Sequence, residues 1–150
     1  MRIIVENRTN TRLPSLSLPS IGRAAEKLLH LARGSEVTVT FVPSRNMRAL
    51  NHRFRGINRT TDVLSFPLHT GRPFPRDPDG VMRLGDIIVS LPTARRQAQR
   101  RQVALREELR ELIVHGLLHL VGYDHNRQKA MARMRRATAT LLGSGFRPSR

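Results

Sequence analysis

Three histidines, His115, His119 and His125, have the residue type and the spacing of ligands to one metal ion. In a helix, residues four apart lie about 40° apart around the axis and one turn above each other, so the first two can aim ring nitrogens at a shared point. Gly122 suits a helix end with a left-handed backbone, after which the chain could bring His125 to that point. Three neutral imidazoles and one water would complete a tetrahedron with an open position, which is typical of a catalytic zinc site.

Another class of metalloenzyme, the metzincin proteases, shares this histidine spacing. Those enzymes place Glu directly after the first His, where it acts as general base for water attack on a peptide. Here that position is Gly116. A metalloprotease therefore remains an alternative that fits the spacing of the metal ligands, but this chain lacks the general base of the metzincins.

The other polar residues of this region have less specific interpretations. A lone His in an apolar helix is usually a hydrogen-bonded core residue, but three of the six histidines within eleven residues favour metal binding. Glu108 and Glu111 share the histidine-bearing face and could accept an imidazole N–H, although we favour solvated charges near the start of the helix. Asp124 could orient a ligand, shuttle a proton or cap a turn. The remaining histidines show no ligand spacing and are interpreted as surface or core residues: His30, His52 and His69.

The composition predicts one globular domain over residues 1–150, which we interpret as a metal-dependent hydrolase domain. Hydrophobic residues make up 39% and charged residues 25% of the 150 residues, as in soluble proteins. No apolar stretch approaches the ~20 residues of a membrane span, and the N-terminus lacks the layout of a signal peptide. We therefore expect a cytoplasmic protein with no membrane partner. Because the chain has no cysteine, any metal site must use His, Asp or Glu.

The charge of the chain predicts a polyanionic partner. Lys plus Arg is 27 and Asp plus Glu is 11, which gives a net charge of +16, and nucleic acid is the usual partner of so basic a chain. A basic tail covers about residues 143–150. Aromatic residues are only 4%, so we expect base stacking to be minor and sequence specificity to be low. The candidate RNA-binding residues lie in two basic stretches: Arg95, Arg96, Arg100 and Arg101 in the first, and Arg133 and Arg136 in the second.

Hydrophobic periodicity predicts an α+β domain with one small mixed sheet of about four strands and about five helices. Strands are expected over residues 1–5, 37–41, 63–66 and 84–89. Helices are expected over 20–33, with Gly34 as its stop, and over 43–54, with Gly56 as its stop. After Pro92 the pattern is helical almost to the end, with the histidine-bearing helix over 103–121. The predicted order is βαβαββ followed by three helices.

Several motifs resemble those of one known family. The segment HGLLHLVGYDH, residues 115–125, closely resembles the signature of the YbeY family, the bacterial endoribonucleases of rRNA maturation. The order and spacing of three further blocks agree, and the resemblance covers about residues 36–125. The sequence departs from the family over Ile57-Asn58-Arg59-Thr60. The further blocks are Leu50-Asn51 with Phe54-Arg55-Gly56, then TDVLSFP at 61–67, then Leu84-Gly85-Asp86-Ile87.

The resemblance implies an α+β fold and one Zn²⁺ per chain on the three histidines, with other divalent transition metals as alternatives. It also implies cleavage of single-stranded RNA, 16S rRNA 3′ end maturation, ribosome quality control, and the ribosome or small-subunit proteins as partners. The family's arginine near the metal falls on Arg55, where a guanidinium could grip a scissile phosphate with two donors. A non-catalytic, ribosome-associated RNA-binding protein with a structural metal remains a further alternative.

The expected chemistry follows from the metal. A bound Zn²⁺ lowers the pKa of its water from about 15.7 to about 7. The resulting hydroxide could attack the phosphodiester itself, or it could act as base for attack by the neighbouring 2′-OH. The sequence leaves both routes open, and it also leaves the oligomeric state open.

Overall fold

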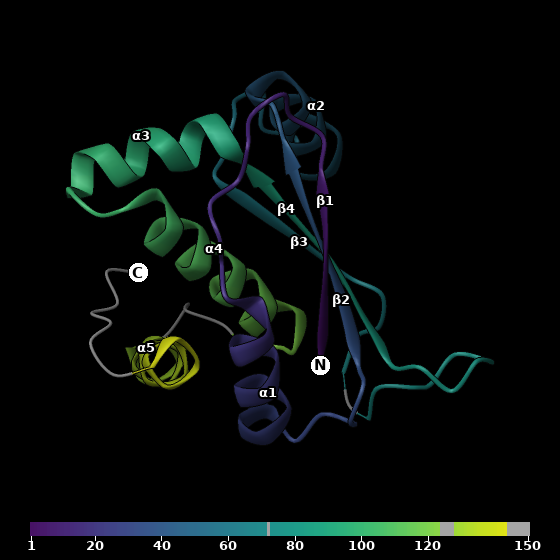
Figure 1. Ribbon diagram of the computed structural model, residues 1–150. Coiled ribbons are helices and arrows are strands. Elements are labelled where there is room, and N and C mark those ends of the chain that lie inside the picture. The colour runs from purple at the N-terminus through teal and green to yellow at the C-terminus, as the bar shows by residue number, and fades with distance from the viewer. Residues whose placement is uncertain (72, 124–127, 144–150) are drawn as a thin grey trace.

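A computed structural model describes residues 1–71, 73–123 and 128–143, and it confirms the predicted α+β fold and element order (Figure 1). The helices and strands in chain order are β1 (Arg2–Asn7), α1 (Leu18–Leu29), β2 (Glu36–Val42), α2 (Ser44–Arg55), β3 (Val63–Pro67), β4 (Arg83–Ser90), α3 (Leu91–Arg101), α4 (Leu105–Leu120) and α5 (Gln128–Leu142). No helix within the described segments is both long and apolar enough to cross a membrane.

The four strands form one mixed sheet in the order β1-β2-β4-β3. β1, β2 and β4 are parallel, whereas β3 pairs with β4 in the antiparallel direction. β1 and β3 are therefore the edge strands. The register sets Ser65 of β3 opposite Ile87 of β4, at the position where the sheet meets α4.

The core lies mainly between the sheet and α4. Side chains of α4 that are fully buried join those of β2, β4, α1 and α5 in the larger apolar cluster. A smaller cluster, Val42, Met47 and Leu64, lies under α2 on the other side of the sheet. Helix α4 is thus packed from several sides, which suits it to hold side chains in fixed positions. Its fully buried residues include Leu109, Leu112, Ile113 and Leu117.

One predicted helix end is wrong. The first helix ends at Leu29 rather than running to residue 33. His30 adopts a left-handed backbone with φ 51° and donates its N–H to the Glu26 carbonyl, which closes the helix one turn early. Gly34 instead serves the turn before β2. The prediction of a left-handed Gly122 after α4 is confirmed, with φ 88°.

The prediction of solvated carboxylates on α4 is also wrong. Glu108 and Glu111 are 0% and 1% exposed, because α3 packs over this part of α4. Arg101, at the end of α3, forms ion pairs with both carboxylates. The two acids therefore help to join α3 to α4.

Candidate active site

A cleft of about 420 Å³ brings together the end of α2, the beginning of β3 and one face of α4. Arg55 comes from α2, whereas His115 and His119 come from α4. The wall between them is formed by Thr61, Asp62, Val63, Leu64 and Ser65. Three of the sequence-predicted site residues therefore meet in one place.

The two histidines converge as their spacing predicts. Their Nε2 atoms are 3.1 Å apart, and their rings are 4.6 Å apart at an angle of 75°. Two tetrahedral ligands, each 2.0–2.1 Å from one zinc ion, would have nitrogens about 3.3 Å apart. The pair therefore fits two ligands of a single ion.

The third predicted ligand, His125, lies outside the described residues, as does Asp124. Within the described part of the chain, no three His, Asp or Glu side chains form a group that could hold a metal ion. The three-histidine site thus stays a prediction, although the described pair fits it.

The residue between the histidines has no room for a side chain. A Cβ at Gly116 would lie 2.8 Å from Ile87 Cγ2 and 3.1 Å from Ser65 Oγ. The Ser65 hydroxyl donates to the Gly116 carbonyl at 3.2 Å, so α4 and β3 approach closely here. Position 116 faces the sheet rather than the cleft, and a Glu base of the metzincin kind could not stand there without moving the helix.

Arg55 lies on the rim of the cleft as the last residue of α2. Its side chain is exposed, and within the described segments its guanidinium has no hydrogen bond or ion pair. The following loop is anchored by buried Asn51, whose Nδ2 donates to the Arg59 carbonyl at 2.7 Å. Arg48 Nε donates to Asn58 Oδ1 at 2.9 Å. The segment that departs from the family motif is thus held in place, and Arg55 is available to an anionic substrate.

Asp62 is the acidic residue among those that line the cleft, and we did not single it out from the sequence. Its Oδ1 accepts the Val63 N–H at 2.8 Å, and its Oδ2 accepts Gln97 Nε2 of α3 at 3.0 Å. Its carbonyl accepts the Ser90 N–H at 2.8 Å. Only the TDVLSFP motif pointed to Asp62, and nothing in the sequence pairs it with a residue 35 positions away.

The predicted RNA-binding arginines do not line this cleft. Arg95, Arg96 and Arg100 are exposed on α3, whereas Arg101 is bound to the buried carboxylates. On α5, Arg133 lies over the Tyr123 ring at 4.7 Å and Arg136 is exposed. Their role in RNA binding stays a prediction.

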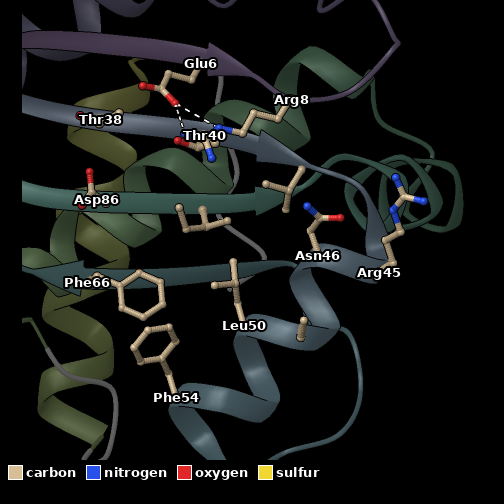
Figure 2. Close-up of a pocket in the computed structure, with 13 residues that line it drawn as sticks. Glu6, Arg8, Thr38, Thr40, Arg45, Asn46, Leu50, Phe54, Phe66 and Asp86 are labelled. Carbon is tan, nitrogen blue, oxygen red and sulfur yellow. Dashed lines mark hydrogen bonds and ion pairs between the residues drawn. The ribbon is translucent and has the colours of Figure 1, made fainter.

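A second groove, of about 850 Å³, lies between α2 and the strands (Figure 2). Phe54 of α2 and Phe66 of β3 meet edge to face, with ring centres 4.9 Å apart. Asp86 and the Glu6–Arg8 ion pair face the same groove, in which Figure 2 shows Phe66 near one end and Arg45 near the other. This groove is partly apolar and carries two carboxylates, so its chemistry differs from that of the histidine cleft.

Comparisons with known proteins identify one family. The profile of the family described as Endoribonuclease YbeY matches residues 6–144. An Endoribonuclease YbeY from Thermus thermophilus is 40% identical over 141 residues, which are 93% of this chain and 99% of that protein. One from Picosynechococcus is 40% identical over 152 residues, covering 93% of this chain and 91% of that one.

A solved structure shows the same fold. The solution structure of TM1509 from Thermotoga maritima is 27% identical, with a TM-score of 0.58, and the match covers 94% of this chain and 89% of that one. The histidine motif, the cleft that it forms with Arg55 and these matches along most of the chain lead to one conclusion. This chain belongs to the Endoribonuclease YbeY family.

Proposed function

We propose that this protein is a metal-dependent endoribonuclease that cuts single-stranded RNA in the cleft between α4, β3 and the end of α2. Family membership supports the class of reaction. The observation that carries the site assignment is the convergence of two imidazole nitrogens, 3.1 Å apart, beside the guanidinium of Arg55.

The metal would be held by His115 and His119 together with His125. The donor set is all imidazole, which suits Zn²⁺ and also other divalent transition metals. When bound, such an ion would act as a Lewis acid and would make water more acidic. Because Gly116 excludes a carboxylate next to the first ligand, a peptide-cleaving mechanism with a base at that position is disfavoured.

Arg55 would bind the scissile phosphate. A guanidinium presents two N–H donors in a geometry that matches two phosphate oxygens. Because the structure gives Arg55 no competing partner among the described residues, its charge can serve the substrate. Negative charge grows on those oxygens in the transition state, so the contact would strengthen there.

Asp62 would act as a positioning residue for the cleft wall. Gln97 donates to Asp62 Oδ2, whereas the Val63 N–H and the Thr61 hydroxyl donate to Oδ1. The carboxylate thereby joins the beginning of β3 to α3, so the wall keeps its distance from the histidines. Ser65, which donates to the Gly116 carbonyl, fixes the same wall to α4.

We further propose a role in 16S rRNA 3′ end maturation and ribosome quality control, in the cytoplasm, with the ribosome or its small-subunit proteins as partners. The support is the resemblance of the four motif blocks and the net charge of +16. Incubation with small subunits that carry unprocessed 16S 3′ ends tests this role. The proposal predicts shortening by the wild type, whereas 3′ ends left unchanged would contradict it.

The active-site proposal is tested with variants purified side by side and assayed on a single-stranded rRNA fragment. His115→Ala should lose both the stoichiometric metal and cleavage. Arg55→Ala should keep the metal and lose about 10²-fold in turnover, the usual effect of removing one charge-stabilising donor. Two matched controls should behave as wild type: His30→Asn, which suits the left-handed backbone there, and exposed Arg53→Ala. Equal cleavage by His115→Ala and wild type would overturn the proposal.

The same assay separates the two chemical routes. Attack by water breaks the P–O bond and leaves one linear phosphate end and one hydroxyl end. Attack by the 2′-OH expels the 5′ oxygen, which takes up a proton, and leaves a 2′,3′-cyclic phosphate. Sequencing the product ends distinguishes them.

A further inference from the structure

Two grooves lead from the histidine cleft along the outer side of α2. The first, of about 730 Å³, lies between α2 and the loop 58–60 and is lined by Arg45, Arg48 and Arg59 among others. It reaches Thr60, and the next residue, Thr61, already lines the cleft. The first groove and the cleft are thus lined by neighbouring residues of one segment.

The second groove continues the first. Its volume is about 760 Å³, and it lies where the segment after β1 meets the first turns of α2 and α3. Arg45 and Ser44 line both grooves, so the two are contiguous. Arg95 and Arg96 of α3 line its far side.

Both grooves carry positive charge without a compensating acid. No Asp or Glu is among the described residues that line either one, in contrast to the groove of Figure 2, which is lined by Glu6 and Asp86. The guanidinium groups of Arg45, Arg59 and Arg95 have no hydrogen bond or ion pair within the described chain.

Two further arginines in these grooves are bonded only to neutral groups. Arg48 donates to the Asn58 side chain and Arg96 donates to the Thr93 hydroxyl. Like charges gathered in this way repel one another unless a polyanion lies among them. Arg8 also lines the second groove, but its charge is paired with Glu6.

We propose that these two grooves are the path of the RNA backbone on one side of the cut site. The path is the basic track of Arg59, Arg48, Arg45, Arg95 and Arg96. The inference rests on the proposed function in one respect, namely that RNA is cut at the histidine cleft. Beyond the proposed function, the inference states where the RNA strand is held next to the cut site and which arginines hold it.

The dimensions of the track suit several nucleotides. Helix α2 has 12 residues from Ser44 to Arg55, which corresponds to about 18 Å at about 1.5 Å per residue. A stacked strand with one phosphate per about 3.4 Å would place on the order of five phosphates along it. No Phe, Tyr or Trp is among the described residues of either groove, so the track would mainly bind the backbone and read little of the base sequence.

The track modifies the predicted set of RNA-binding arginines. Arg95 and Arg96 belong to it, and Arg45, Arg48 and Arg59 join them from the preceding helix and loop. Arg100 and Arg101 do not line either groove. The lining of the second groove along α3 ends at Gln99, and Arg101 is paired with the buried carboxylates of α4.

RNA binding by metal-free protein in EDTA tests the track without reference to cleavage. We would compare wild type with Arg45→Ala/Arg59→Ala/Arg95→Ala, which removes three exposed side chains that form no hydrogen bond or ion pair among the described residues. The control is Arg12→Ala/Arg23→Ala/Arg106→Ala, which removes three exposed arginines elsewhere. Both variants change the net charge from +16 to +13, that is 16 − 3.

The readout is the salt dependence of the Kd for a fluorescent single-stranded RNA. Each phosphate contact contributes about 0.7 to the slope of log affinity against log salt, so the track variant should lose about 2 from the slope. Starting from equal affinities at 1 M salt, the track variant should bind about a hundredfold more weakly than wild type at 0.1 M salt. The control variant should keep the wild-type slope. Equal slope changes in the two variants would overturn the proposal.

A second RNA series locates the track relative to the cut. Neutral methylphosphonate linkages are placed either on the 5′ side or on the 3′ side of the cleavage site. On one of the two sides, they should make wild type and the track variant bind equally, because the phosphates that the track contacts are gone. If neither RNA series reduces the difference in Kd between wild type and the track variant, the track is not on the substrate path. Cleavage retained by His115→Ala would instead refute the proposed function. The binding results would still test the track, because they do not depend on cleavage.

Discussion

Replacing Arg101 by Ala should destabilise the fold rather than weaken RNA binding in particular. Its guanidinium is the ion-pair partner of Glu108 and Glu111, whose side chains are 0% and 1% exposed, and it contacts Glu111 Oε2 at 2.7 Å. Removing one partner of a buried ion pair costs 3–5 kcal/mol, because the remaining charge stays desolvated. Arg101 is itself 24% exposed, so water can enter the vacated space, and we expect the lower end, about 3 kcal/mol.

Urea unfolding followed by circular dichroism measures this loss. With a slope of about 2 kcal/mol per M, the midpoint should fall by about 1.5 M. Arg100→Ala is the matched control, because this neighbour is exposed and has no such partner among the described residues. It should unfold with the wild-type midpoint. Equal midpoints for the two variants would refute the argument from burial.

A third variant separates the cost of unpaired charge from the loss of packing. In Arg101→Met/Glu108→Gln/Glu111→Gln, no buried charge remains, so at least half of the lost stability should return. If this variant is less stable than Arg101→Ala, the carboxylates stabilise the fold by something other than their charge.

Two further predictions concern the cleft. Gly116→Ala should lower the free energy of unfolding by about 1–3 kcal/mol, because the added Cβ would lie 2.8 Å from Ile87 Cγ2 and must push α4 away from the sheet. Zinc stoichiometry and thermal unfolding check it, and wild-type values for both would show that the helix has room. Gln97→Leu should reduce kcat about tenfold with metal content and KM unchanged, because it removes the donor to Asp62 Oδ2. Exposed Gln128→Leu is the control, and an unchanged kcat for Gln97→Leu would exclude a positioning role.

The histidine pair could be predicted because helical spacing is a local property of the chain. Once residues 105–120 are helical, His115 and His119 must lie on one face. Strand order along the chain and the mixed sheet followed from periodicity in the same way. The end of α1 did not, since His30 takes a left-handed conformation and ends the helix before Gly34, the expected stop.

Features that depend on contacts between distant segments could not be predicted. Glu108 and Glu111 have the spacing of solvated helix charges, and only the packing of α3 makes them buried. Gln97 and Asp62 are 35 residues apart and belong to no shared motif. The joining of Arg45 and Arg59 with Arg95 likewise depends on how α2 meets α3.

The position of the cleft in the sheet suits cleavage inside a long strand. β3 is an edge strand, so within the described part of the chain no further strand lies beyond it to close the cleft that its first residues line. The histidines, by contrast, are on the most buried helix of the fold, which is brought close to the sheet at Gly116. The histidines are thus held by a rigid helix at a cleft that is open on the side of β3. An endonuclease needs this combination, because the reacting groups must be fixed while the polymer enters and leaves on both sides of the bond that is cut.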